Sequence, residues 1–368
     1  MLAAIALSGA LALTGCAKDS GGGTSAAAGP CKLADKPAPA AGGSTSSTDS
    51  GPKVDASALR VGLAYDIGGR GDASFNDAAA AGLDRSKTEL GVKEARETTA
   101  SANEPDDAKE SRLRQMAQDG LSPIITVGFA YADALKAVAP QFPNTKFAII
   151  DESVDAPNVT SLVFAEEQGS FLVGVAAAYK SKSCHIGFVG GVDNPLIQKF
   201  EAGFIQGAKT AAPDIKIENE YLTPAGDFTG FNDPAKGNVI AGGEIERGAD
   251  VVYHAAGASG NGVFEAVKAK NKLAIGVDSD QYNMKTVASS KDVIMTSMVK
   301  RVDLAVFDYL KAVTSNQLAS LPKRYDLSVD GITYATSGGK IDDIKAVLDG
   351  YKQQIIDGKI TVSDKPSG

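Results

Sequence analysis

The sequence predicts an α/β protein built of two doubly wound parallel-sheet lobes, and three observations support this fold class. From residue 59 onward, short runs of Val, Ile, Leu and Ala alternate with longer amphipathic stretches. The short runs lack the polar alternation of a half-exposed strand, so they indicate strands buried on both faces of a parallel sheet. The alternation continues to about residue 356, which is more chain than one sheet of ordinary size uses.

The expected elements follow one another as strand, helix and strand. Strands are expected at residues 59–65, 123–127, 146–150, 185–189, 215–221, 251–254, 273–277, 293–298 and 331–335. Helices are expected at residues 75–90, 130–138, 168–179, 195–209, 234–246, 260–270, 300–312 and 341–356. Connections of this kind are right-handed crossovers, which join parallel strands.

The order of the elements predicts that each lobe is made of two stretches of chain. Lobe 1 is expected at residues 59–163 and about 299–331, and lobe 2 at residues 164–298 and about 332–368. The chain then crosses between the lobes several times. Such a multi-strand hinge allows the lobes to close around a ligand.

The N-terminus indicates export. Residues 1–15 contain no charged side chain and consist mostly of Ala and Leu. They are too short to cross a bilayer, which takes about 20 apolar residues, and are typical of a signal peptide. The stretch ends in Leu13-Thr14-Gly15-Cys16, which resembles the lipobox of bacterial lipoproteins. That resemblance implies cleavage before Cys16 and a diacylglycerol on its sulfur, with palmitate among the acyl chains. We therefore expect a lipoprotein anchored on the extracytoplasmic face of the cell membrane.

Residues 16–58 are expected to form a flexible linker that begins at the lipidated cysteine. The stretch is mostly Gly, Ala, Ser, Thr and Pro, so it buries too little apolar surface to offset the entropy of ordering it. Cys31 lies in this linker, and Cys184 lies at the start of an expected strand. An exported protein can form a disulfide. The sequence leaves open whether these two cysteines form one or remain independent thiols.

Charge and composition narrow the classes of function. The net charge is −8, and so acidic a chain offers no basic surface for nucleic acid. The chain has two His residues, and neither stands in a metal-ligand spacing. We expect a monomer that holds no metal and no cofactor.

Candidate binding residues follow the expected strands, because ligands bind beyond the carboxyl ends of the strands in open α/β sheets. Residues 66–76 follow the first strand and contain several glycines, which permit close approach of a ligand. Ser74 is a candidate N-cap for the next helix. Phe75 is suited to stack on a flat heterocycle, and Asn76 is suited to hydrogen-bond its edge. Plain turn and cap chemistry would explain these residues as well.

Further polar residues follow later strands. Asp151 follows the strand at 146–150, and Gly257 lies in a glycine-rich loop that leads into a helix. Backbone amides at a helix N-terminus suit an oxygen-rich group. Asp278 follows another strand, and Lys300 is expected to begin the helix after the next one. An Asp and a Lys together can hold vicinal hydroxyls, although an ordinary structural ion pair explains them equally well.

These segments resemble the basic membrane protein family of substrate-binding lipoproteins, whose best-understood members are purine-nucleoside receptors. The matching segments are residues 66–76, 147–151, 164–171, 187–191, 200–204, 256–257, 276–281, 297–301 and 355–360. They occur in the family's order. The resemblance implies a type I periplasmic-binding-protein fold that holds a nucleoside between its two lobes.

The resemblance also implies the ligand-binding residues. They are Asp66, Phe75, Asn76, Asp151, Gly257, Asp278 and Lys300. Phe75 would stack on the base, and Asn76 and Asp151 would hydrogen-bond its edge. Asp278 and Lys300 would hold the ribose, assisted by backbone near Gly257, and Asp66 would form a polar wall. The family uses a second stacking or wall residue from the other lobe, for which Phe200, Tyr253 and His254 are the candidates.

The expected function is capture of a nucleoside, with a purine favoured, for an ABC transporter whose permease and ATPase subunits import it. We expect no catalysis, because no Ser nucleophile elbow is present. A nucleoside-cleaving enzyme nevertheless stays open, since carboxylates alone can do acid–base work. A surface sensor or adhesin stays open too, as does an ABC receptor for another heterocycle or a sugar.

Overall fold

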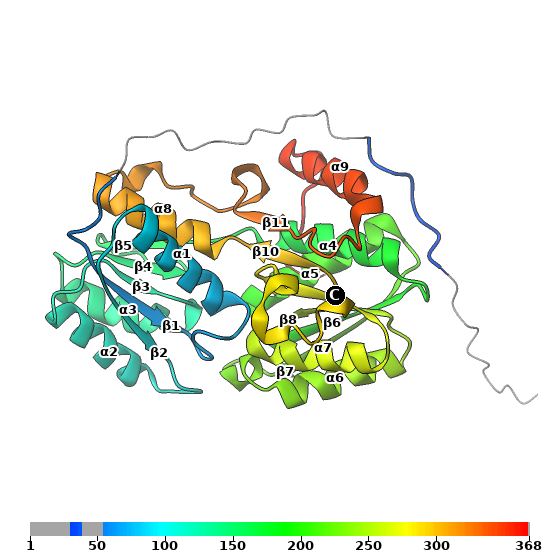
Figure 1. Cartoon of the computed structure of the whole chain (residues 1–368), viewed down its shortest axis with the longest axis horizontal. Helices are drawn as coiled ribbons and strands as arrows, with labels where there is room; N and C mark the ends of the chain where they lie inside the picture. Colours follow the sequence, from blue (N-terminus) through cyan, green and yellow to red (C-terminus); the bar gives the residue numbers. More distant parts are fainter. Residues whose placement is uncertain (1–29, 39–53, 367–368) are drawn as a thin grey trace, which may run out of the picture.

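The computed structural model describes residues 30–38 and 54–366. They form two α/β lobes that lie side by side and are joined along one edge (Figure 1). Each lobe has its own sheet with helices on both faces. This is the fold class that the sequence predicts.

Lobe 1 is built on a parallel sheet in the order β2-β1-β3-β4-β5. Its strands are β1 (Arg60–Tyr65), β2 (Glu94–Thr99), β3 (Ile124–Thr126), β4 (Phe147–Ile150) and β5 (Val159–Leu162). One face is covered by α1 (Phe75–Glu89) and α8 (Val302–Ser315), and the other by α2 (Asp106–Gln118) and α3 (Ala132–Val138). The interior strand β4 is buried along its whole length, as its run of apolar residues predicts.

Lobe 2 is built on a sheet in the order β11-β10-β9-β8-β6-β7, in which β11 is antiparallel to its neighbour. Its strands are β6 (His185–Val192), β7 (Lys216–Thr223), β8 (Val251–Ala255), β9 (Leu273–Asp278), β10 (Ile294–Lys300) and β11 (Ile332–Tyr334). One face is covered by α4 (Glu166–Lys180) and α5 (Pro195–Ala211), and the other by α6 (Pro234–Glu246) and α7 (Gly260–Ala269). The last helix, α9 (Lys345–Ile356), packs against α4.

The chain passes between the lobes between β5 and α4, between β10 and α8, and again before β11. Backbone hydrogen bonds hold these crossings together. Tyr325 N donates to Val163 O at 2.8 Å, and Ala165 N donates to Tyr325 O at 3.0 Å. Arg301 N donates to Gly331 O at 2.9 Å. The crossings therefore form one hinge.

Most of the expected strands and helices are present, with ends that differ by a few residues. Three elements were not expected, namely β2, α2 and β5. The two strands lie at the edges of the lobe 1 sheet and are only partly buried, and α2 is strongly polar, so none has the apolar pattern of a buried element. One expected boundary is wrong: Lys300 is the last residue of β10, and α8 begins at Val302.

Part of the expected linker is ordered. The expectation of a flexible chain throughout this segment is wrong for residues 30–38, which lie against lobe 2. Ala34 N donates to Ala211 O at 2.8 Å. Pro37 lies so close to Gly350 that a Cβ added to that glycine would be 3.0 Å from its ring. These residues belong to the folded body of lobe 2.

Cys31 and Cys184 form a disulfide, with their Cα atoms 4.7 Å apart. The structure therefore decides between a bridge and two independent thiols, which the sequence left open. The bridge fastens the N-terminal segment to the chain just before β6. The expected signal peptide at residues 1–15 and the expected lipidation site Cys16 lie outside the described residues.

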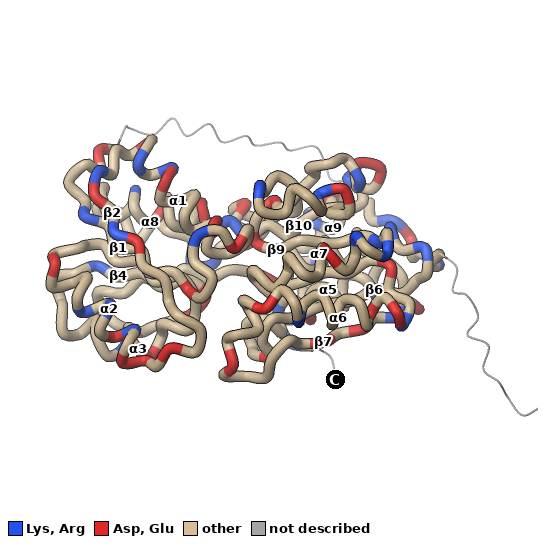
Figure 2. The backbone as a smooth tube through the Cα atoms, turned by 60° about the horizontal axis from the view of Figure 1, so that its bottom comes forward, with Lys and Arg blue, Asp and Glu red and all other residues tan. Residues whose placement is uncertain are grey.

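Lys and Arg residues alternate with Asp and Glu residues along the backbone of both lobes (Figure 2). Within the part of the chain that the structure describes, no helix has the length and apolar character needed to span a bilayer.

Removing the disulfide should destabilise the protein. The bridge joins residues 153 positions apart, and a cross-link over so long a loop restricts the unfolded chain, which contributes about 2–4 kcal/mol. Cys184→Ser should lower the free energy of unfolding in urea by about that amount. Cys31→Ser should lower it equally, and the double variant should lose no more than either single variant. Additive losses would show that the two sulfurs act independently.

Candidate functional site

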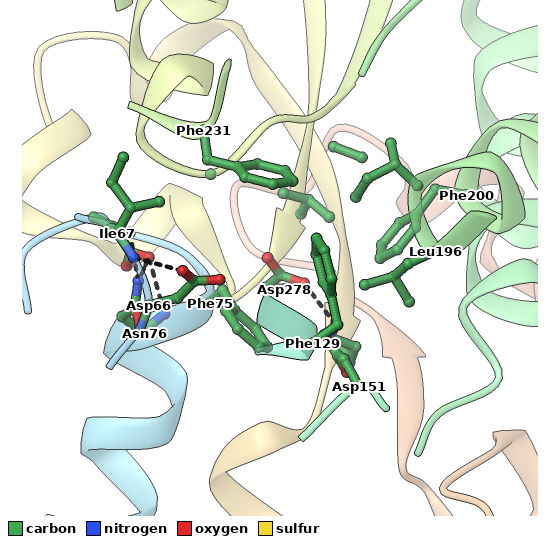
Figure 3. A pocket seen from close by; sticks show the side chains of 16 residues that line it. Asp66, Ile67, Phe75, Asn76, Phe129, Asp151, Leu196, Phe200, Phe231 and Asp278 are labelled. Atoms are coloured by element: carbon green, nitrogen blue, oxygen red, sulfur yellow. Dashed lines mark hydrogen bonds and ion pairs between the residues drawn. The ribbon is translucent and has the colours of Figure 1, made fainter. Parts of the chain in front are cut away.

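A cavity of about 540 Å³, part of it open to solvent, lies between the lobes. Lobe 1 contributes Asp66, Ile67, Asp72, Phe75, Asn76, Phe129 and Asp151. Lobe 2 contributes Leu196, Ile197, Phe200, Phe231, Ala255, Gly257, Val277, Asp278 and Lys300. The cavity thus brings together every residue expected to bind the ligand, and also Phe200 (Figure 3).

The loop between β1 and α1 is held in shape by Asp72. Its carboxylate accepts hydrogen bonds from the backbone amides of Ser74 at 2.9 Å, Asn76 at 2.9 Å and Asp77 at 3.1 Å. Asp72 therefore caps the N-terminus of α1. Ser74 occupies the N-cap position, as expected, but its side chain makes no capping hydrogen bond. Ser74 Oγ instead donates to Asp278 Oδ2 at 2.8 Å, which is a contact between the lobes.

Asn76 holds the same loop from the first turn of α1. Its Nδ2 donates to Asp72 Oδ2 at 2.9 Å and to Ile67 O at 3.2 Å. Its Oδ1 accepts from Asp66 N at 3.1 Å. Both amide hydrogens are thus engaged within the protein, and one lone pair of Oδ1 is left for a ligand.

Asp66 follows β1 directly and faces the cavity from lobe 1 (Figure 3). Its Oδ1 accepts from Ile67 N at 2.8 Å. Gly128 approaches the other oxygen so closely that an added Cβ would lie 2.5 Å from it, and its φ of 102° also favours glycine. Burial raises the pKa of Asp66 to about 6 and that of Asp72 to about 6.

Lys300 carries the positive charge of the site, and its side chain is only 2% exposed. Its Nζ donates to Asp151 Oδ2 at 2.6 Å. The same nitrogen lies 3.8 Å from Asp278 Oδ1 and 3.9 Å from Glu166 Oε1. Asp151 belongs to lobe 1, whereas Lys300 and Asp278 belong to lobe 2. One buried ammonium therefore joins the two lobes.

Two of these carboxylates stand on an unusual backbone conformation. Asp151 has a φ of 71° and Asp278 a φ of 63°, and both are at the carboxyl end of a strand. This left-handed region is uncommon for residues other than glycine, although Asp adopts it more readily than most. Such conformations concentrate at functional sites.

Lys300, Asp151, Asp278 and Glu166 form one buried cluster of charged groups. Burial also governs the protonation of this cluster. It raises the pKa of Asp278 in spite of the nearby Lys300, and it raises the pKa of Glu166 to about 7. Burial lowers the pKa of Lys300, but the carboxyl groups of Asp151, Asp278 and Glu166 raise it by more, so its net direction is upward. The lysine therefore stays charged.

Three buried carboxyl oxygens of the cluster accept no hydrogen bond from any residue that the structure describes. They are Asp151 Oδ1, Asp278 Oδ1 and Glu166 Oε1. A buried acceptor without a donor costs free energy. The cluster is thus suited to a ligand that donates hydrogen bonds.

Aromatic side chains form the apolar walls. The rings of Phe75 and Phe200 have their centroids 4.6 Å and 5.4 Å from Lys300 Nζ. Phe129 and Phe231 meet edge to face with their centroids 6.5 Å apart. These last two residues were not among those expected from the sequence. Each follows the carboxyl end of a strand, β3 or β7, so the rule that found Asp66 and Asp151 would also have found them.

Two of the three candidates for a second stacking or wall residue are wrong. Tyr253 is fully buried in the core of lobe 2, where its hydroxyl lies 3.2 Å from Ser170 Oγ. His254 is also fully buried, with Nε2 3.1 Å from Gln281 Oε1. Burial lowers the pKa of His254 to about 4. Neither side chain lines the cavity.

Contacts between the lobes surround the cavity. Gln281 Nε2 donates to Ala73 O at 3.0 Å, and Ser279 Oγ donates to Ser74 O at 2.9 Å. Together with the Lys300 ion pair they hold lobe 1 against lobe 2. In residues 30–38 and 54–366, no group of three or more His, Cys, Asp or Glu side chains is arranged to hold a metal ion.

Glu166 should make the stability depend on pH. Burial raises the pKa of its carboxyl from 4.5 to about 7, so the folded protein holds this proton more tightly than the unfolded chain. The resulting stabilisation is complete below about pH 4.5 and is lost as the pH rises through about 7. The charged groups that act on it are Lys300, Asp151 and Lys199.

Glu166→Gln should therefore flatten the fall in the free energy of unfolding over this pH range, as measured by urea unfolding at successive pH values. Glu265→Gln, on the exposed face of α7, is the matched control and should keep the wild-type slope. Parallel plots of unfolding free energy against pH for the wild type and Glu166→Gln would contradict the raised pKa of Glu166.

Comparison with known proteins agrees with this geometry. Residues 59–363 match the family model described as ABC transporter substrate-binding protein PnrA-like. A CD4+ T-cell-stimulating antigen of Listeria innocua is 36% identical over 345 residues, which cover 89% of this chain and 94% of the relative. The ABC transporter nucleoside-binding protein BmpA of Lactococcus lactis is 33% identical over 322 residues, which cover 83% of this chain and 90% of the relative.

A solved structure agrees as well. An ABC transporter system solute-binding protein from Aeropyrum pernix superposes with a TM-score of 0.71 at 27% identity, over 84% of this chain and 94% of that protein. The resemblance to the basic membrane protein family and the two-lobed binding-protein fold are both confirmed. Members of the family are substrate-binding proteins of ABC transporters rather than enzymes. The chain belongs to this family of PnrA-like ABC transporter substrate-binding proteins.

Proposed function

We propose that this substrate-binding protein captures a purine nucleoside between its lobes and delivers it to the permease and ATPase subunits of an ABC importer. One observation carries the proposal. A single cavity combines buried carboxyl oxygens that accept no hydrogen bond from the described residues with aromatic walls. A nucleoside has a matching part for each, since its sugar donates hydrogen bonds and its base is flat.

The polar end of the cavity suits the ribose. Asp278 Oδ1 and Asp151 Oδ1 are acceptors in need of donors, and two vicinal hydroxyls supply them. Lys300 uses one of its hydrogens on Asp151, which leaves others for a sugar oxygen. The same group of carboxylates opposes a phosphate, because bringing like charges together in a poorly solvated site is unfavourable. A nucleoside therefore fits better than a nucleotide.

The aromatic end suits the base. Phe75, from lobe 1, is the proposed stacking residue on one side. Phe200 and Phe231 of lobe 2 both line the cavity. We assign the opposite stacking position to Phe231, which meets Phe129 of lobe 1 edge to face. Asp66 and the free lone pair of Asn76 Oδ1 are the proposed acceptors for the edge of the base. The relative from Lactococcus lactis bears the name of a nucleoside-binding protein, which supports this choice of ligand.

The protein would act at the cell surface as a monomer. The lipobox that ends at Cys16 supports a lipid anchor on the extracytoplasmic face of the membrane. Such an anchor would keep the receptor near its permease.

A panel of ligands tests the proposal. Guanosine, adenosine or inosine at 100 times its dissociation constant should stabilise the fold by about 2.7 kcal/mol, which a thermal-shift assay detects as a higher Tm. Free ribose and guanosine 5′-monophosphate should leave Tm unchanged. A higher Tm with a sugar, or with a heterocycle other than a nucleoside, would show that the ligand belongs to that class instead. Release of free base during incubation would favour a nucleoside-cleaving enzyme.

The stacking role of Phe75 is tested by substitution. Phe75→Ala should abolish the thermal shift by nucleosides, because it removes the face on which the base lies. The ligand-free variant should remain folded, since the side chain is only partly buried. Phe142→Ala removes another partly buried aromatic ring of lobe 1 that does not line the cavity, and it should keep the shift. Normal nucleoside binding by Phe75→Ala would refute the stacking role.

A further inference from the structure

We propose that Asn103 is a positioning residue for ligand capture, which clamps the lobe 2 loop bearing Phe228 and Phe231 onto lobe 1 and so prolongs the bound state. The role in capture rests on the proposed function. Asn103 does not line the cavity, so it would act through the loop that it holds.

The clamp consists of two hydrogen bonds from one exposed amide. Asn103 Nδ2 donates to Asp227 Oδ1 at 3.1 Å, and Asn103 Oδ1 accepts from Phe228 N at 3.0 Å. The partners are 124 and 125 positions away in the chain and belong to the other lobe. Because the donor and the acceptor of a single amide engage two consecutive residues, the pair fixes the orientation of the loop as well as its distance.

Lobe 1 presents Asn103 on a rigid turn. Asn103 has a φ of 51°, a conformation that Asn adopts more readily than most residues. The neighbouring Glu104 accepts from Ser101 N at 3.1 Å and pairs with Arg112 through contacts of 2.5 Å and 2.7 Å. Arg112 in turn donates to the Tyr131 hydroxyl at 3.0 Å. The amide is therefore held in place before the lobes meet.

The lobe 2 loop that Asn103 contacts is also held by its own hydrogen bonds. Asp227 Oδ1 also accepts from Thr229 N at 3.1 Å and from Thr229 Oγ1 at 2.6 Å. The short helix Phe228–Phe231 follows, and its last residue lines the cavity. Phe129 of lobe 1 meets Phe228 edge to face with their centroids 5.5 Å apart. The clamp and this aromatic contact thus act on the same loop.

The clamp differs from two other contacts between the lobes. The hydrogen bond from Ser74 and the ion pair of Lys300 involve Asp278 and Asp151, which are proposed to touch the ligand. Asn103 can be changed without altering any group that lines the cavity. A contact made only when the lobes are together stabilises that state, raises the apparent affinity and slows dissociation more than it speeds association.

Asn103→Gly tests the clamp, because glycine keeps the left-handed backbone and removes the amide. Asn271→Gly is the matched control: Asn271 is also exposed, has a φ of 52° and lies at the end of α7. With guanosine as the probe, Asn103→Gly should raise Kd about tenfold, the loss expected for two hydrogen bonds. Stopped-flow measurements should show that the higher Kd comes from a faster dissociation rate. Asn271→Gly should leave both quantities unchanged.

An unchanged dissociation rate, or an equal loss in both variants, would overturn the clamp. If the wild type binds no nucleoside, the proposed function fails, and small-angle X-ray scattering of the ligand-free proteins tests the clamp by itself. A larger radius of gyration for Asn103→Gly than for Asn271→Gly would support it. Equal radii would overturn it.

Discussion

The arrangement of the site depends on the ion pairs of the buried Lys300 ammonium. It lies among carboxyl groups of both lobes, with Asp151 at 2.6 Å and Asp278 at 3.8 Å. Removing one partner from a buried ion pair leaves a charge without compensation, which is strongly unfavourable. Separation of the lobes must therefore bring water to these groups. Closure of the cleft, protonation of the cluster and binding of a hydrogen-bond donor are coupled through this one nitrogen.

The rest of the site is preorganised around that cluster. Asp72 and Asn76 use most of their hydrogen-bonding capacity to shape the loop before α1, and the loop in turn places Phe75 beside Lys300. Asp151 Oδ1 and Asp278 Oδ1, in contrast, accept no hydrogen bond from the described residues. The contacts at the rim, through Asn103, add a second constraint on the same closed state.

The polar half of the site could be located from the sequence, but not all of the aromatic half. Asp66, Asp151 and Asp278 were found because each stands at the carboxyl end of a strand, where parallel sheets place their ligands. Tyr253 and His254 do not line the cavity, because their side chains are fully buried in lobe 2. Phe129 and Phe231 were missed although they follow β3 and β7 and stand in glycine-containing segments, so the same rule applied to these two strands would have found them.

The sequence by itself determined the two-lobed α/β fold, the order of its main elements and the segments that meet at the site, because apolar periodicity and strand ends are local properties of the chain. Tertiary structure alone decided the pairing of Cys31 with Cys184, the sharing of Lys300 between the lobes and the contact of Asn103 with Asp227. Each of these joins residues more than a hundred positions apart. Their distances follow from how the lobes pack and close, which no local pattern encodes.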